Sequence, residues 1–290
     1  MSTPDEAPCS IMTGLISFAG IRFLDRSDYE ALDAGAVLAA LDDLAGAFSL
    51  VLLTECDSTN SRLLADLPPD DGRVHVLAAD VQTSGRGRRG RAWKSWPGAS
   101  LTFSALWRFA PDAPVPAGLS LVAGLAVARA LEELGVEGVQ LKWPNDVLVH
   151  GRKLAGILVE LTPGRGRVPA AVVGIGINLQ LPPDADVEYA TGVTDLAACL
   201  GRAPDASRLL GLVLVQLHRL FEVYAAAGFS ALRGAWQQRN AFANLPVNIL
   251  GEAEALAGIC AGVDDDGALL LQTPGGLRRV LSGEVSLRLA

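Results

Sequence analysis

The chain has 290 residues, which exceeds a typical single domain, and half of them are hydrophobic, so it can bury a sizeable core. A formal net charge of −8 at pH 7 excludes wholesale nucleic-acid binding through a basic surface. The 4 cysteines are widely scattered and form no CxxC pair, which excludes a structural zinc site and a disulfide framework and favours a reducing cytoplasm.

The N-terminal residues 1–33 have no clear hydrophobic period, and we predict a loosely attached leader there. The apolar run at residues 11–21 follows Asp5 and Glu6, where a signal peptide needs basic residues. Arg22 ends that run well short of a membrane span. We therefore expect a soluble, cytoplasmic protein with no membrane association.

The next elements are a helix, a strand and a short second helix. Apolar residues recur at helical spacing from Ala34 to Phe48, which predicts one amphipathic helix, and residues 48–54 predict a strand. The sequence DSTN at residues 57–60 is an N-cap cluster that opens a short helix through Leu67. Capping residues at a strand-to-helix junction also leave hydroxyl and backbone N–H groups free to bind a ligand. A capping role and a ligand-binding role therefore both remain open for Ser58 and Thr59.

A glycine- and arginine-rich stretch, QTSGRGRRGRAWKSWPG, occupies residues 82–98 after a predicted strand at 74–81. Glycine alternates with positive charge from Gly85 to Arg91, and no continuous apolar face could hold this run in a helix or a central strand. Glycine costs much conformational entropy to order, so we predict a loop that an anion organises. A solvated basic segment is the alternative.

The spacing Gly85-x-Gly87-x-x-Gly90 also satisfies the dinucleotide-binding fingerprint. That fingerprint requires a helix directly after the loop, whereas Pro97-Gly98 follows here and forbids one. The acidic residue expected about 20 positions on has no match other than Asp112. We therefore reject a dinucleotide site.

A strand at residues 100–109 and a buried apolar helix at 118–134 come next. Residues 139–161 then predict two strand-like runs around a hairpin turn at 150–153, with a second break at Pro144-Asn145-Asp146. A lysine in a turn, such as Lys153, is usually solvated. Nearly uncharged strands flank this turn, however, and a second cation-rich loop belongs to the same domain, which favours a functional role.

A further buried strand is predicted at residues 170–179. Gly174 and Gly176 within it suit the close approach of a ligand or a second backbone, and a bulge is the alternative. Two helices follow, from Asp205 to Gly228 and from Phe229 to Asn240. Beyond them, short strands separated by turn residues predict a small β-barrel. These strands are expected near residues 247–250, 255–263, 268–272, 277–281 and 284–288.

The chain lacks the motifs of nucleophilic catalysis by a side chain, namely a GxxxxGK[ST] loop, an HExxH sequence and a Ser/His/Asp elbow. His75, His150 and His218 are each predicted to be structural. What remains is glycine backbone, arginine and lysine, which suit joint binding of a carboxylate and a nucleoside triphosphate. Positioning and charge neutralisation suffice for attack on a phosphate, so we predict an adenylation reaction.

Five motifs in one order resemble those of biotin–protein ligases. They are DSTN at 57–60, QTSGRGRRGR at 82–91, KWPNDVLV at 142–149, GRKLAGILVE at 151–160 and VVGIGIN at 172–178. The terminal GEVSLR at 283–288 resembles the end of the family's small domain. The resemblance covers roughly residues 34–290.

The resemblance implies an α+β fold, with a class II aminoacyl-tRNA synthetase-like catalytic domain built on a mixed sheet and a small C-terminal SH3-like β-barrel. The implied domains are an N-terminal leader at 1–33, a biotin- and ATP-binding catalytic domain at 34–242, and an SH3-like domain at 243–290.

The reaction implied by the resemblance has two steps. Biotin and ATP, with Mg²⁺, give biotinyl-5′-adenylate and pyrophosphate. A lysine of a biotin carboxyl carrier domain, from acetyl-CoA carboxylase or a related carboxylase, then takes the biotinyl group with release of AMP. The expected enzyme is thus a biotin–[biotin carboxyl carrier protein] ligase, for which a homodimer is left open.

The resemblance also implies site residues. Contacts to biotin or the adenylate fall on Ser58, Thr59, Asn60, Gln82, Arg86, Gly87, Arg88 and Lys153. Lys153 and Arg88 are the expected catalytic residues. Arg91 matches an arginine at the nucleotide phosphate, and Trp93 matches a tryptophan that stacks on adenine. Asn145 and Asp146 are candidates to place Mg²⁺ or the triphosphate, although Pro-Asn-Asp is also a plain turn former.

Some family members carry an N-terminal winged helix that binds an operator. Here only about 50 residues precede DSTN and their net charge is negative, which is too short and too acidic for a DNA-reading module, so we expect no repressor activity.

Two alternatives remain. One is a lipoate–protein ligase of the same fold, which the KWPND and GRGRRGR sequences disfavour. The other is a single-stranded nucleic-acid groove formed by residues 86–91 with Trp93, Trp96 and Trp107, which the overall acidity disfavours.

Overall fold

The computed structural model describes residues 31–110, 117–162, 170–187, 189–251, 256–283 and 285–290. Most of the predicted leader at 1–33, and Cys9 with it, therefore lies outside the described residues.

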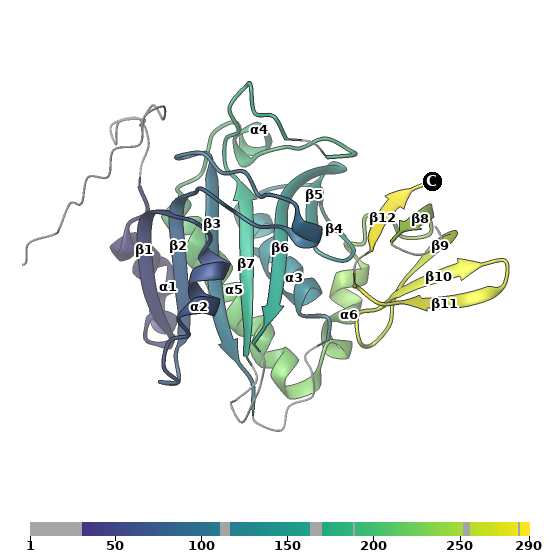
Figure 1. The fold of residues 1–290 in the computed structure, drawn as a ribbon, viewed down its shortest axis with the longest axis horizontal. Helices are drawn as coiled ribbons and strands as arrows, with labels where there is room; N and C mark the ends of the chain where they lie inside the picture. The colour runs from purple at the N-terminus through teal and green to yellow at the C-terminus, as the bar shows by residue number, and fades with distance from the viewer. Residues whose placement is uncertain (1–30, 111–116, 163–169, 188, 252–255, 284) are drawn as a thin grey trace, which may run out of the picture.

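A seven-stranded mixed sheet forms the centre of the larger part of the molecule (Figure 1). Its strand order is β1-β2-β3-β7-β6-β5-β4, with β1 parallel to β2 and every other neighbouring pair antiparallel. The strands are β1 Phe48–Cys56, β2 Val74–Gln82, β3 Ser100–Arg108, β4 Val139–Lys142, β5 Asp146–Val149, β6 Arg152–Leu161 and β7 Ala170–Asn178. The predicted mixed sheet is confirmed.

Helices cover both faces of this sheet. The helices are α1 Ala34–Leu41, α2 Thr59–Ala65, α3 Leu119–Glu133, α4 Leu196–Leu200, α5 Ala206–Ala227 and α6 Ser230–Gln237, with 3₁₀ helices η2 Asp42–Ala47 and η3 Arg88–Gly90. The helices α1, α3 and α5 form one layer, and α2 packs against β3 and β7 from the other side. Ser58, within the predicted N-cap cluster, caps α2, and Asp205, where the sequence predicts a helix to begin, caps α5.

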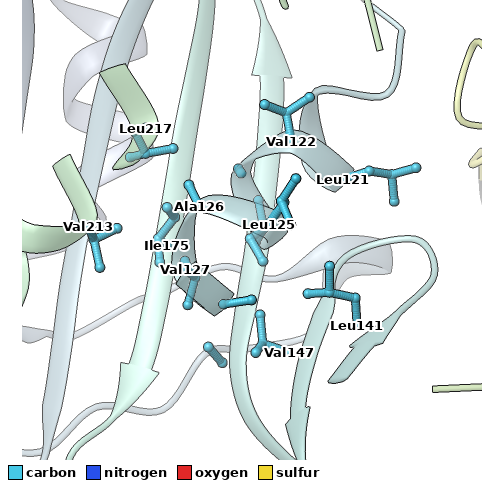
Figure 2. Close-up of a cluster of buried hydrophobic side chains, with 14 of the residues drawn as sticks. Leu121, Val122, Leu125, Ala126, Val127, Leu141, Val147, Ile175, Val213 and Leu217 are labelled. Carbon is cyan, nitrogen blue, oxygen red and sulfur yellow. The ribbon is translucent and has the colours of Figure 1, made fainter. Parts of the chain in front are cut away.

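The main hydrophobic core lies between α3, α5 and the sheet (Figure 2). Leu125 of α3 is fully buried there, in one cluster with Ile175 of β7 and Val147 of β5. Burial of one such aliphatic side chain stabilises the fold by roughly 1.5–3 kcal/mol. By length and composition alone, the helix α5 could cross a membrane. Apolar side chains of this helix, Val213 and Leu217 among them, are instead buried in this core.

The small C-terminal part is a five-stranded antiparallel sheet of order β11-β10-β9-β8-β12. Its strands are β8 Pro246–Leu250, β9 Leu256–Val263, β10 Leu269–Thr273, β11 Gly276–Val280 and β12 Ser286–Leu289. Cys260, Leu271 and Leu287 are buried within it. The predicted succession of short strands is confirmed, with bounds that differ by one or two residues.

Two predicted elements were wrong in detail. The helix predicted from Ala34 to Phe48 ends at Leu41, because Asp42 adopts a positive φ of 52° that an α-helix does not allow. In the unit at 139–161 the predicted break at Pro144-Asn145-Asp146 separates β4 from β5, but Lys153 lies within β6 and not in the hairpin turn. The short helix α4 was not predicted.

The close packing of α1 on α5 depends on Gly211, and this gives a stability test. A Cβ at Gly211 would lie 2.5 Å from Ala40 Cβ and 3.0 Å from Val37 O, whereas one at Gly234 of α6 would meet nothing within 4 Å. We expect Gly211→Ala to lower the free energy of unfolding by about 1–3 kcal/mol through overpacking. Gly234→Ala should raise it by up to about 1 kcal/mol through helix propensity. Urea unfolding of both variants checks this, and equal effects would contradict the packing argument.

Candidate active site

A cavity of about 1000 Å³ opens where α2, the segment after β2, the β4–β5 turn, the segment after β7 and the small C-terminal sheet meet. All of the site residues predicted from the sequence line it: Ser58, Thr59, Asn60, Gln82, Arg86, Gly87, Arg88, Arg91, Trp93, Asn145, Asp146 and Lys153. The fold thus brings together segments that are far apart along the chain. We call residues 83–99 the basic loop and residues 179–195 the β7–α4 segment.

The floor of the cavity is a network of uncharged polar groups. Because Ser58 caps α2, Thr59 and Asn60 start the helix as buried residues. The backbone N–H and the hydroxyl of Thr59 both donate to Gln82 Oε1, at 2.7 and 3.1 Å. The hydroxyl of Ser104, fully buried on β3, lies 2.7 Å from Thr59 Oγ1 and 2.5 Å from Asn60 Oδ1. Such a floor suits a ligand group that is polar but neutral.

Two glycines of β7 make room for this floor. A Cβ on Gly174 would lie 2.1 Å from Asn60 Oδ1, and one on Gly176 would lie 2.3 Å from the indole ring of Trp93. The close approach predicted for these glycines is therefore made by side chains of the chain itself. The alternative of a bulge was wrong, because β7 pairs in continuous register with β3 and β6 at both positions.

The basic loop is tied to the rest of the site by its arginines. Arg86 Nη2 donates to Glu160 Oε2 at 2.6 Å, and the same oxygen accepts from Asn60 Nδ2 at 2.9 Å. Arg88 donates to Asn145 Oδ1 at 3.2 Å and to the backbone carbonyl oxygens of residues 282 and 283 in the small C-terminal part. The loop therefore connects the cavity floor to the small sheet.

The other end of the cavity holds a cluster of charges around Asp146. Its carboxylate lies 2.5 Å from Lys153 Nζ and 3.7 Å from Lys142 Nζ, and it accepts a hydrogen bond of 2.7 Å from the hydroxyl of Tyr189. Burial disfavours the charged form of Asp146, but Lys153 and Lys142 outweigh this effect and hold its pKa below the usual value. Burial also lowers the pKa of Lys142 to about 8, against the opposing effect of Asp146.

Several residues of the site carry no prediction from the sequence. Lys142 enters the sequence prediction only as part of the KWPNDVLV motif, and Ser104 only as part of the strand expected at residues 100–109. Their contacts and those of Glu160, Tyr189 and Arg288 join segments far apart in sequence, which local patterns do not reveal. The alternation of Ser100, Thr102 and Ser104 with apolar residues along β3 is the one available signal, because a hydroxyl that becomes buried needs a partner.

Comparison with known proteins gives two matches to family models. Residues 55–178 match the biotin/lipoate A/B protein ligase family, and residues 244–288 match the biotin protein ligase C-terminal domain.

Relatives of known function agree with these matches. The biotin–[acetyl-CoA-carboxylase] ligase of Paracoccus denitrificans is 38% identical, over 81% of this chain and 98% of its own length. The bifunctional ligase/repressor BirA of Escherichia coli is 36% identical, over 90% of this chain and 79% of its own length. The solved structure of biotin protein ligase from Aquifex aeolicus in complex with biotin and ATP superposes with a TM-score of 0.73 at 34% identity, over 83% and 99% of the two chains.

The lowered pKa of Lys142 makes stability depend on pH in a defined direction. Its folded pKa of about 8 lies below the usual 10.5, so the unfolded chain binds more protons between these values and stability rises with pH. We expect the free energy of unfolding of the parent protein, minus that of Lys142→Met, to rise by about 2 kcal/mol from about pH 7.5 to about pH 10. Denaturant titrations at several pH values measure this difference. A flat or falling difference would contradict the burial of a charged Lys142.

Proposed function

Because the chain belongs to the biotin–protein ligase family, we propose that the cavity between the basic loop and the large sheet is the site of biotin activation. The protein activates biotin with ATP to biotinyl-5′-adenylate and pyrophosphate, and it then transfers the biotinyl group to a lysine of a biotin carboxyl carrier domain with release of AMP.

The observation that carries this proposal is the division of one cavity into a neutral polar floor and a cationic end. Biotin has the same division, since a neutral hydrogen-bonding ring system lies at one end and a carboxylate at the other. We assign the ring system to the floor formed by Thr59, Asn60 and Gln82. The carboxylate then points toward Lys153, whose ammonium group lies in the same cavity.

The first step is attack of a biotin carboxylate oxygen on the α-phosphorus of ATP, with pyrophosphate as the leaving group. Negative charge gathers on the phosphate oxygens and on the departing pyrophosphate, and the step needs no covalent bond to the enzyme. Lys153 and Arg88 are the cations that we assign to this charge, because both line the cavity beside Asn145 and Asp146. In the second step the neutral ε-amine of the carrier lysine attacks the acyl carbon and AMP departs.

The mixed anhydride reacts readily with water, so it must be covered between the two steps. The basic loop is suited to this task, because Arg86 fixes it to Glu160 near the floor and Arg88 fixes it to the small C-terminal part. We assign the nucleotide to Arg91 and Trp93 of this loop. The ring of Trp93 lines the cavity and lies on the backbone of Gly176.

Mg²⁺ is expected to accompany ATP. Among the described residues, no group of three or more His, Cys, Asp or Glu side chains could hold a metal ion. The oxygens of Asp146 face Lys153 and Tyr189, and Asn145 Oδ1 accepts from Arg88. These residues do not fit a metal cage, so we assign the ligands of Mg²⁺ to the phosphate oxygens.

The acceptor that we propose is the carrier domain of acetyl-CoA carboxylase or a related carboxylase, as the name of the Paracoccus denitrificans relative indicates for that enzyme. We propose ligase activity without operator binding, because residues 1–56 carry net negative charge, which opposes contact with DNA. A cytoplasmic location agrees with the free thiols of Cys56, Cys199 and Cys260. A homodimer remains a proposal that the oligomeric state in solution would test.

The affinity for biotin, measured by titration calorimetry, and the rate of adenylate formation test the assignment of Lys153. Lys153→Met removes the cation assigned to the reacting carboxylate, so we expect adenylate formation to slow by about 100-fold. Arg152→Met is the matched control, because it removes a neighbouring cation of the same strand, β6. The side chain of Arg152 does not line this cavity. Its rate should stay within about threefold of the parent's. Binding of lipoate in place of biotin would overturn the proposed substrate, and equal rates in both variants would overturn the role of Lys153.

A further inference from the structure

One aromatic side chain from the β7–α4 segment, Tyr189, reaches the charged end of the cavity. Its hydroxyl oxygen lies 2.5 Å from Lys142 Nζ and 2.7 Å from Asp146 Oδ2. The other oxygen of the same carboxylate, Oδ1, lies 2.5 Å from Lys153 Nζ. The hydroxyl of Tyr189 therefore touches two members of the charged cluster and is one group removed from the third.

The segment that carries Tyr189 is fixed to β6 at Lys153 itself. The backbone N–H of Lys153 donates to Gly192 O at 3.0 Å, and the N–H of Thr194 donates to Lys153 O at 2.9 Å. These two bonds join the backbone of the β7–α4 segment to the strand that presents the Lys153 side chain. The position of the phenol relative to Lys153 is thus set by backbone geometry and not by side-chain contacts alone.

The directions of the hydrogen bonds admit one arrangement. An ammonium group can only donate and a carboxylate can only accept, whereas a phenol does one of each. Burial, together with Asp146, holds the pKa of Tyr189 well above its usual value, so the hydroxyl keeps its proton. The hydroxyl accepts from Lys142 and donates to Asp146, which places a neutral bridge between these two groups.

The aromatic ring of Tyr189 makes a second contribution. Its centroid lies 4.7 Å from Lys142 Nζ and 4.9 Å from Lys153 Nζ. Both distances fall within the range of cation–π attraction. Two like charges that share a buried corner repel each other, and the ring offsets part of that repulsion at Lys153, whereas Lys142 is held by the hydroxyl.

We propose that Tyr189 is a positioning residue for adenylate formation, which keeps Lys142 from closing onto Asp146 and so leaves the Asp146–Lys153 pair aimed at the reacting carboxylate. The proposal rests on the proposed function of this cavity. Lys142 Nζ lies 3.7 Å from Asp146 Oδ2, and the phenol hydroxyl bridges the two groups. Loss of the hydroxyl lets Lys142 move onto the carboxylate and draw it away from Lys153.

Tyr189→Phe tests the proposal, because it removes the hydroxyl and keeps the ring. The matched control is Tyr224→Phe, which removes a hydroxyl that donates to Ala117 O outside the cavity. The dissociation constant of biotin is measured by calorimetry, the rate of adenylate formation by single-turnover quench, and folding by thermal melting. We expect Tyr189→Phe to slow adenylate formation by about 10- to 100-fold with biotin affinity within about twofold of the parent's. Tyr224→Phe should change neither quantity.

Each other outcome is decisive. An unchanged rate in Tyr189→Phe would overturn the positioning role. A parallel loss of biotin affinity, rate and melting temperature would show that Tyr189 only supports the fold, which also overturns it. Failure of the parent protein to form any adenylate from biotin and ATP would instead overturn the proposed function, and this inference with it.

Discussion

The site depends on one electrostatic constraint: two lysine ammonium groups and one carboxylate share one corner of the cavity, where Lys142 and Asp146 are largely buried. Lys142 is only 6% exposed, and an unpaired charge at such a depth costs several kcal/mol. Asp146 is the anion that both lysines share. Lys142 and Asp146 are paired across the antiparallel strands β4 and β5, so the tight turn between these strands brings the two charges together. The hairpin that follows then places Lys153 on the adjacent strand β6.

The small C-terminal sheet takes part in the same arrangement. Trp143, at the turn between β4 and β5, is fully buried and donates from its indole to Gly267 O at 3.0 Å. Arg88 of the basic loop bonds to carbonyl oxygens of residues 282 and 283. The turn that carries Asp146 and the loop that covers the site are thus both attached to the C-terminal sheet. A change in the packing of that sheet would therefore reach the charged cluster through two separate contacts.

Much of the fold follows from patterns that are local in the sequence. The alternation in β3, the apolar periodicity of α3 and the capping residue Ser58 all act within a few residues, and these elements form where they are predicted. The helix predicted through Phe48 ends before Asp42, where the backbone adopts a positive φ. The spacing of hydrophobic residues does not reveal such a change in backbone conformation. The lysine predicted in a turn lies on a strand, since Arg152 and Lys153 extend the β6 ladder with β5.

The site was predictable only as far as its residues form contiguous motifs. The glycine and arginine spacing of the basic loop indicates an anion, and the lysines indicate where charge is offset. The groups that orient these residues could not be predicted in this way. Tyr189 meets Asp146 across 43 residues, and Glu160 meets Arg86 across 74, so no window of the sequence contains either pair. Which residues meet in such pairs depends on the register of the strands in the large sheet. The periodicity of the sequence does not define that register.

The central claim is that one cavity makes an activated biotin, keeps it from water and passes it to a carrier. The most direct measurement is to incubate the protein with biotin, ATP and Mg²⁺, remove free ligands by gel filtration, and then add a biotin carboxyl carrier domain. We expect that biotinyl-adenylate elutes with the protein and that the carrier is biotinylated in a single turnover without further ATP. Absence of a retained adenylate, or an adenylate that forms and is never transferred, would contradict it.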